Sequence, residues 1–241
     1  VLEYLDDLAG YRRVISRRRA LMKEADGAQF ESDQFTHAAW ELVSALHPQS
    51  MQLRVKEVLI ETRSTTTFRL ERLDGAIPPF RAGQYINLFK EIDGVRTSRP
   101  YSVSSAPTSS AIDVTVKDVE GGFVAPHLTR ELRPFDVVET SGPMGSFYHE
   151  PLIHGDELVF IAAGSGITPF MSMIRDFLMK PHGRPRVRLI YGARSKDVIF
   201  RRKLETIAQL SDWFDLSLVF SDSPSGWEGL SGRIDGDVLT T

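Results

Sequence analysis

The hydrophobic and polar positions follow three different patterns along the chain. In residues 1–48 apolar residues recur at three- and four-residue steps, from Leu2 to Leu21 and again over 33–46, where Pro48 ends the pattern. Apolar residues at this spacing share one face of a helix. The pattern therefore predicts a helical N-terminal extension over residues 1–50.

The second pattern predicts short strands. Segments 51–62 and 66–73 partly alternate apolar and polar residues, as half-buried strands do, and the turn signals Asp74-Gly75 and Pro78-Pro79 follow. We expect further strands at 85–90, 102–104, 112–117 and 137–141, and one short helix at 125–133. Strands at such regular spacing indicate an antiparallel barrel, here assigned to residues 51–153.

The third pattern, from residue 154 to 241, is typical of an α/β domain. Residues 157–163 (ELVFIAA) form a continuous apolar run, which predicts a strand buried on both faces. The expected elements that follow are helix 169–180, strand 187–191, helix 200–209 and strand 214–220. This alternation predicts a parallel sheet with crossover helices.

Composition narrows the classes of function. The 241 residues carry 29 Lys+Arg against 32 Asp+Glu, a net charge of −3, so no general attraction to nucleic acid is expected. Cysteine is absent, which excludes disulfides, thiolate catalysis and a cysteine-held iron–sulfur cluster within these residues. We expect no metal site, no membrane span, because no apolar run reaches 18 residues, and a cytoplasmic location.

One loop carries the clearest chemical signal. Gly164-Ser165-Gly166-Ile167-Thr168-Pro169 lies between a predicted buried strand and a predicted helix. Glycines allow a tight turn and a close approach of a ligand to the backbone, and Pro169 fits the first position of a helix. The free N–H groups of a helix start favour an anionic pyrophosphate. The third glycine of the G-x-G-x-x-G fingerprint is missing, so a turn without a ligand stays open on this loop alone.

The order of several motifs resembles that of the ferredoxin–NADP reductase superfamily. The resemblance spans roughly residues 51–241 and rests on an ordered set of segments. They are Arg99-Pro100-Tyr101-Ser102, Gly121-Gly122-Phe123-Val124, Gly142-Pro143-Met144-Gly145-Ser146-Phe147, the 164–169 loop, Tyr191-Gly192-Ala193-Arg194-Ser195 and Trp227-Glu228-Gly229.

The resemblance implies an FAD site on the barrel. Arg99 is then expected to pair with the flavin phosphate, Tyr101 to lie against the isoalloxazine ring, and Ser102 to hydrogen-bond near flavin N5. The family holds the FAD pyrophosphate at the glycine turn, and here Ala125 replaces the usual Ser or Thr. The implied cofactor-binding residues of the barrel are Arg99, Pro100, Tyr101, Ser102, Lys117, Gly121, Gly122, Phe123 and Val124.

The resemblance also implies a nicotinamide nucleotide site. Thr168 and Pro169 correspond to residues that face the nicotinamide and flavin rings, and Arg194 and Ser195 to residues that read the adenosine ribose. A cation and a hydroxyl suit the 2′-phosphate of NADPH, with NADH as the alternative and Asp197 as a residue that favours it. The implied residues are Gly164, Gly166, Ile167, Thr168, Pro169, Arg194 and Ser195. Ser102, Tyr101 and Thr168 are the expected catalytic residues.

The expected function is an FAD-dependent NAD(P)H oxidoreductase that passes electrons to an iron–sulfur or haem protein such as a ferredoxin or an oxygenase. Two alternatives stay open: an FAD-binding electron-transfer subunit fed by a partner protein, and a non-catalytic interaction module. The chain stops short of the last strand of the family's NAD(P) domain. We therefore expect a longer native protein, in which a 2Fe–2S cluster would lie outside residues 1–241.

Overall fold

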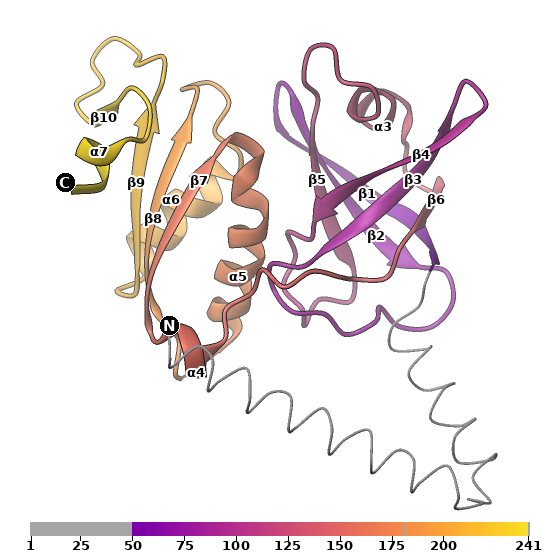
Figure 1. Cartoon of the computed structure of the whole chain (residues 1–241), viewed down its shortest axis with the longest axis horizontal. Coiled ribbons are helices and arrows are strands. Elements are labelled where there is room, and N and C mark those ends of the chain that lie inside the picture. Colours follow the sequence, from indigo (N-terminus) through magenta and orange to yellow (C-terminus); the bar gives the residue numbers. More distant parts are fainter. Residues whose placement is uncertain (1–49, 181, 241) are drawn as a thin grey trace, which may run out of the picture. The chain divides into compact units, whose positions relative to one another are not determined.

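The computed structural model describes residues 50–180 and 182–240, and the predicted helical extension lies outside the described residues. The described part contains one six-stranded sheet and one four-stranded sheet (Figure 1). The six-stranded sheet comes first along the chain and the four-stranded sheet second. An antiparallel barrel followed by a parallel α/β sheet is confirmed as the fold class.

The barrel consists of antiparallel strands in the order β4-β3-β6-β1-β2-β5. An isolated bridge between Val103 and Val114 joins its two outer strands and closes it. A core that includes Leu53, Phe68 and Ile86 fills the interior. The elements are β1 (Met51–Thr62), β2 (Thr65–Arg72), β3 (Tyr85–Ile92), β4 (Val95–Ser102), β5 (Ile112–Lys117), α3 (Ala125–Glu131) and β6 (Val137–Thr140).

Strand β4 corrects the expectation of a short strand at 102–104. It begins at Val95 and pairs with β3 along its whole length, from Ile92 opposite Val95 to Tyr85 opposite Ser102. No residue of β4 is fully buried, so its sequence lacks the apolar alternation that marks a half-buried strand. Asp93 and Gly94, both with positive φ, form the hairpin turn, and this Asp-Gly pair is a signal that points to the hairpin.

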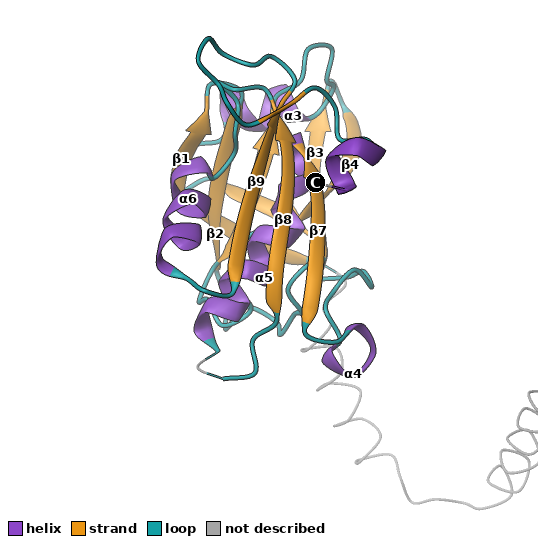
Figure 2. Ribbon diagram, turned by 90° about the vertical axis from the view of Figure 1, so that its left-hand side faces the viewer, coloured by secondary structure: helices purple, strands orange, loops and turns teal. Residues whose placement is uncertain are grey.

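The second sheet has the order β10-β9-β8-β7 and is parallel throughout. Figure 2 shows that β7, β8 and β9 run in the same direction, so their carboxyl ends lie at one edge of the sheet. The elements are α4 (Pro151–His154), β7 (Glu157–Ala163), η1 (Gly164–Gly166), α5 (Ile167–Met179), β8 (Arg186–Ala193), α6 (Arg201–Leu210), β9 (Phe214–Phe220), β10 (Leu230–Ser231) and α7 (Gly236–Thr240).

Strand β7 is not buried on both faces, which corrects the second expectation. Phe160 and Ala162 pack in the same core as the buried residues of α5, whereas Val159 is 62% and Ile161 48% exposed. On that second face Val238 of α7 packs over β8 and β9 only. Among the described residues β7 is also an edge strand, hydrogen-bonded to β8 alone. Its apolar residues 158–163 therefore have one face in the core and one face exposed.

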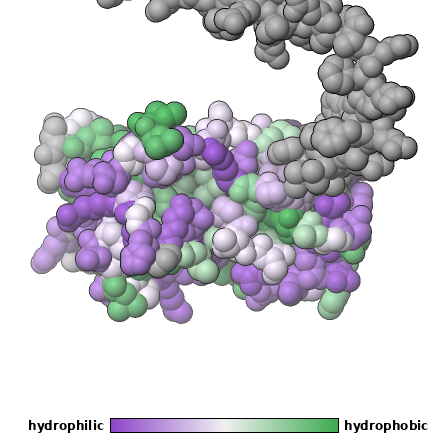
Figure 3. Space-filling view, turned by 90° about the horizontal axis from the view of Figure 1, so that it is seen from below, coloured by the Kyte–Doolittle hydropathy of each residue, from purple (hydrophilic) through white to green (hydrophobic). Residues whose placement is uncertain are grey.

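Hydrophobic residues on the surface do not form one continuous patch on the face seen from below (Figure 3). On the face that Figure 3 shows, hydrophobic areas are separated by hydrophilic residues. Within the described part of the chain, no helix combines the length and the apolar character needed to cross a bilayer.

Candidate functional site

Strand β4 presents the residues expected at the flavin. Arg99 is exposed, and its Nη1 donates to the backbone oxygen of Ser98 at 2.8 Å and to Oγ1 of Thr97 at 3.3 Å. Among the described residues no carboxylate pairs with it. Tyr101 packs against the barrel core, and burial raises the pKa of its phenol to about 12, so the ring is neutral at physiological pH. The Ser102 hydroxyl has no hydrogen-bond partner among the described side chains.

The glycine turn before α3 is tight for a definite reason. The amide of Gly122 donates to the backbone oxygen of Val119 at 2.9 Å, and a Cβ at residue 122 would lie 2.9 Å from that same oxygen. Gly121 has φ +75°, a conformation that suits glycine. Val124 is the N-cap of α3 and provides no side-chain cap bond, because valine has no polar side-chain atom.

The 164–169 loop leads directly into α5. Gly164 has φ +51°, and the helix begins at Ile167 with Gly166 as its N-cap. Pro169 is thus the third helical residue and not the first, which corrects that expectation. A proline still fits there, because the first four N–H groups of a helix have no partner within it. Thr168 is buried, and its Oγ1 donates to the backbone oxygen of Ser165 at 2.9 Å.

A cleft of about 980 Å³ lies between the end of β5 and the carboxyl ends of the parallel strands. It brings together three of the expected cofactor residues, Lys117 from the barrel and Gly164 and Arg194 from the sheet. The remaining expected residues, including those of β4, lie outside its lining. The cleft is also lined by residues that the sequence analysis did not select, among them Arg63, Ser64, Asp118, Glu120, Asp222, Arg233 and Ile234.

Asp197, in the segment after β8, forms hydrogen bonds to the barrel at this cleft. Its carboxylate accepts hydrogen bonds from Nζ of Lys117, from Oγ1 of Thr62, and from Oγ of Ser64 at 2.9 Å. Burial opposes ionisation of Asp197, but these hydrogen bonds outweigh it and lower its pKa below the ordinary value. Asp197 therefore bonds to the barrel while it also lines the cleft, and its role toward a ribose stays a prediction.

Asp222 lines the cleft, and the sequence analysis did not select it. It follows β9 as Arg194 follows β8, and its Oδ1 accepts the backbone N–H of Ser195 at 2.6 Å. Parallel strands end at the same edge, and that common edge is the signal that would have selected Asp222. Arg194 makes no ion pair with any described residue. The sheet side of the cleft therefore carries both a cation, Arg194, and a carboxylate, Asp222.

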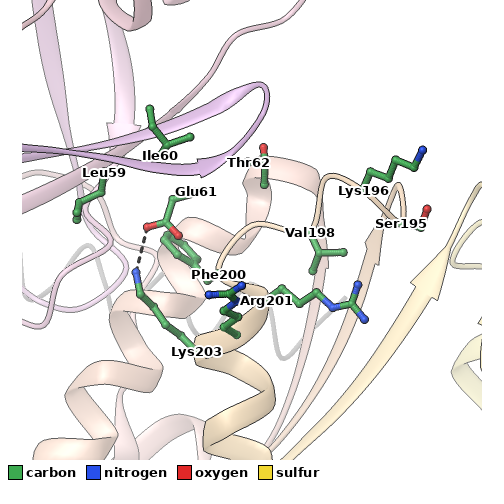
Figure 4. A pocket seen from close by; sticks show the side chains of 11 residues that line it. Leu59, Ile60, Glu61, Thr62, Ser195, Lys196, Val198, Phe200, Arg201 and Lys203 are labelled. Carbon is green, nitrogen blue, oxygen red and sulfur yellow. Dashed lines mark hydrogen bonds and ion pairs between the residues drawn. The ribbon is translucent and has the colours of Figure 1, made fainter.

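A second pocket, of about 700 Å³, lies between the β1–β2 hairpin and the start of α6 (Figure 4). Ser195 and Lys196 line it together with Arg201, Arg202 and Lys203. Two of these cations are already paired, Lys203 with Glu61 at 3.0 Å and Arg201 with Glu205 at 2.8 Å. Lys196 and Arg202 have no carboxylate partner among the described residues.

The histidines near the linker have structural roles. Nε2 of His149 donates to the backbone oxygen of Gly155 at 2.8 Å, and Nδ1 of His154 accepts the backbone N–H of Glu150 at 2.9 Å. Both imidazoles are thus used to shape the segment between β6 and β7.

Two family models match the chain. Residues 50–149 match an oxidoreductase FAD-binding domain, and residues 160–241 match an oxidoreductase NAD-binding domain. The first covers the barrel and the second covers the parallel sheet with its helices.

Known proteins resemble the chain along most of its length. Ferredoxin–NADP reductase B of Sorangium cellulosum is 35% identical over 170 residues, which are 70% of this chain and 68% of that protein. The glycine betaine monooxygenase reductase subunit of Pseudomonas aeruginosa is 32% identical over 78% of this chain. The Amycolatopsis cytochrome P450 reductase GcoB matches with a TM-score of 0.68 and 27% identity over 80% of this chain.

The chain spans 52% of the Pseudomonas protein and 58% of the Amycolatopsis protein. It spans more than two thirds of the Sorangium reductase, at an identity that shows common descent. The chain therefore belongs to the ferredoxin–NADP reductase superfamily, as an oxidoreductase with an FAD-binding and an NAD-binding domain.

Proposed function

We propose that this chain takes electrons from NADPH, passes them through FAD bound on the barrel, and delivers them to an iron–sulfur or haem protein. The observation that carries the proposal is the cleft in which Lys117 of the barrel meets Gly164 and Arg194 of the parallel sheet. Two nucleotide cofactors must meet where the two sheets meet, and the cleft lies at that place. We also propose that the FAD-binding domain comprises residues 51–153 and the NAD(P)-binding domain residues 154–241, after an N-terminal extension of residues 1–50.

The residues of the barrel fit an FAD. Arg99 has no carboxylate partner among the described residues, so its guanidinium is available for a phosphate. Tyr101 offers a neutral aromatic face at the barrel core, and the hydroxyl of Ser102 is available as a donor. A side chain at residue 122 would collide with the backbone oxygen of Val119, so this position must be glycine. The backbone of the turn is therefore open to a pyrophosphate. When bound, FAD supplies the ability to accept a hydride and to release single electrons.

The residues of the sheet align the nucleotide and supply no acid or base. Gly164 and Gly166 leave the backbone of the loop accessible, and the positive end of the α5 dipole lies at this turn, where the N–H of Ile167 is already bonded to the backbone oxygens of Gly164 and Ser165. Thr168, fixed by its bond to Ser165, is proposed to contact the nicotinamide. Rate acceleration then comes from alignment of donor and acceptor.

NADPH is our first choice of nucleotide because of the cations near Ser195. Arg194 lacks an ion-pair partner among the described residues, and Lys196 and Arg202 are likewise unpaired there. A 2′-phosphate requires such cations. NADH is the second candidate, because the carboxylate of Asp222 lies at the same edge and a ribose 2′-hydroxyl pairs with a carboxylate.

The proposed electron acceptor is inferred from the names of similar proteins. The Pseudomonas protein is the reductase subunit of a monooxygenase and the Amycolatopsis protein is a cytochrome P450 reductase. We propose an acceptor of this type for the present chain, a cytoplasmic location, and any 2Fe–2S cluster in a segment outside residues 1–241. A partner-fed subunit remains the alternative that the same fold would serve.

The test is a visible absorption spectrum of the protein, followed by anaerobic addition of NADPH and, separately, NADH. We expect flavin absorbance that NADPH bleaches faster than NADH. Flavin that neither nucleotide bleaches would favour the partner-fed subunit. Protein that holds no flavin even after reconstitution would contradict the proposal.

A further inference from the structure

Two side chains of α5 hydrogen-bond to the loop that follows β4. Ser172 is fully buried, and its Oγ donates to the backbone oxygen of Ser105 at 2.6 Å. Nη1 of Arg175 donates to the backbone oxygen of Ser104 at 2.7 Å. Residues three apart lie on one helix face, so both bonds come from the side of α5 that meets the barrel.

These bonds join the two halves of the proposed hydride-transfer site by a short path. Thr168 lies about one helical turn before Ser172 on α5. On the barrel side, Ser104 and Ser105 come immediately after Val103, the residue that follows Ser102 at the end of β4. The covalent connection, along the chain from β6 to β7, runs through α4. Further polar connections between the two halves are made by Asp197 and by Lys203, which bond to the barrel from the segment after β8 and from α6.

The loop that receives the bonds is itself held firmly. Ser104 donates its backbone N–H to the backbone oxygen of Asp113 at 2.8 Å, and the backbone N–H of Asp113 donates to Oγ of Ser105 at 3.1 Å. The Asp113 carboxylate is buried and accepts two bonds from Arg69, at 2.9 and 3.1 Å. Arg175 also reaches this carboxylate, at 3.2 Å.

Both bonds run between the two halves of the structure and not within either one. The barrel and the α/β sheet have different hydrophobic cores, and Ala82 of the barrel segment packs into the second. Ser172 and Arg175 act between these cores, so their removal changes how α5 sits against the barrel. A displacement of about 1 Å between reacting groups can cost about 100-fold in rate.

We propose that Ser172 and Arg175 are positioning residues, which hold α5 so that Thr168 stays aligned with Tyr101 and Ser102 for hydride transfer. The inference rests on the proposed function. Neither residue touches the reacting atoms. Their effect is therefore expected on the rate of flavin reduction and not on the binding of either cofactor.

The test compares Arg175→Met and Ser172→Ala with Asp176→Asn. Asp176 is the next residue of α5, and within residues 50–180 and 182–240 its one ion pair is with Lys180 of the same helix, at 2.8 Å, so its variant is the matched control. At saturating nucleotide we expect flavin reduction to slow about tenfold or more in Arg175→Met and by a smaller factor in Ser172→Ala. FAD content and the Kd for oxidised nucleotide should change less than twofold, and Asp176→Asn should match the wild type.

A second measurement does not depend on activity. Amide hydrogen exchange of the cofactor-free protein should become faster at 103–106 and 167–172 in both variants, and should not change in the control. If Arg175→Met fails to fold, Ser172→Ala provides both measurements, because it removes one hydroxyl without adding volume.

The outcomes separate the two proposals. Wild-type flavin that neither nucleotide reduces would overturn the proposed function and this inference with it. A wild type that is reduced, with both variants reduced equally fast, would overturn the inference alone. A parallel fall in rate, FAD content and nucleotide affinity would also overturn it, because it would indicate a general structural defect.

Discussion

Strand β4 and the loops around the cleft differ in how their polar groups are engaged. Arg99 on β4 bonds only to neutral oxygens of its own strand, whereas Lys117 in the cleft is already paired with Asp197. Likewise, the backbone N–H of Ser195 is already bonded to Asp222. A phosphate on β4 would thus meet an available cation. In the cleft Arg194 also lacks an ion-pair partner among the described residues, but a nucleotide there would compete with carboxylates for Lys117 and for the Ser195 N–H. Substitutions on β4 should therefore change occupancy, and substitutions in the cleft should change affinity and selectivity.

The largest effect is expected for Arg99→Ala. Loss of a charge-assisted bond to phosphate should weaken FAD binding by about 2–3 kcal/mol, about 30- to 150-fold. The flavin-to-protein absorbance ratio of the purified protein and titration of the apoprotein with FAD measure this. Arg96→Ala is the control, since Arg96 lies on the same strand and pairs with Glu139 at 2.7 Å. Full FAD occupancy in Arg99→Ala would contradict the assignment of β4 as the flavin strand.

Gly122→Ala should be the next most damaging change. The added Cβ would lie 2.9 Å from the backbone oxygen of Val119, so the turn must open at a cost of about 1–3 kcal/mol. Gly166→Ala provides the comparison, because nothing lies within 4 Å of a Cβ there. We expect a lower melting temperature and weaker FAD binding for Gly122→Ala only. Equal melting temperatures for both variants would show that the turn is not constrained.

Arg194→Ala and Asp222→Asn should shift nucleotide selectivity in opposite directions. Loss of Arg194 should raise KM for NADPH about tenfold more than KM for NADH, since an exposed ion pair to phosphate contributes about 1 kcal/mol or somewhat more. Loss of the Asp222 charge should favour NADPH by a few-fold. Steady-state KM values for both nucleotides test the pair. An Arg194→Ala variant that raises both KM values equally would refute a role at the 2′-phosphate.

The smallest effect is expected for Asp197→Asn. Lys117 would lose its charged partner and become available to an anionic nucleotide, so the Kd should fall several-fold at low salt and less at high salt. Because hydrogen bonds lower the pKa of Asp197, the wild-type carboxylate stays ionised throughout pH 6–8. Its contribution to stability is present above the unfolded pKa and is lost only as pH falls through the lower folded pKa.

Equilibrium titration with nucleotide at two salt concentrations and at pH 6 and pH 8 measures this effect. The wild-type Kd should show no change that comes from Asp197 across this range. Weaker nucleotide binding in Asp197→Asn at low salt would mean that the carboxylate organises Lys117 and does not compete for it.

The sequence by itself determined the order of the elements and the position of the glycine turns. Local patterns are enough for this, because alternation in 51–62, the apolar run 157–163 and the Gly-Ser-Gly loop depend on neighbouring residues only. The full length of strand β4 was not predicted, because all of its side chains are at least partly exposed and its sequence shows no regular alternation of apolar and polar residues. Its Asp93-Gly94 turn was the available signal.

Only the tertiary structure decided which charged groups meet. Asp197 faces Thr62 across 135 residues and Lys117 across 80, and no local pattern encodes such pairs. The exposed face of β7 could not be predicted from the sequence either, because its burial depends on which helix covers the strand and not on the strand's own residues. The bonds from Ser172 and Arg175 to Ser105 and Ser104 follow the same rule, since they exist only where two separate cores pack together.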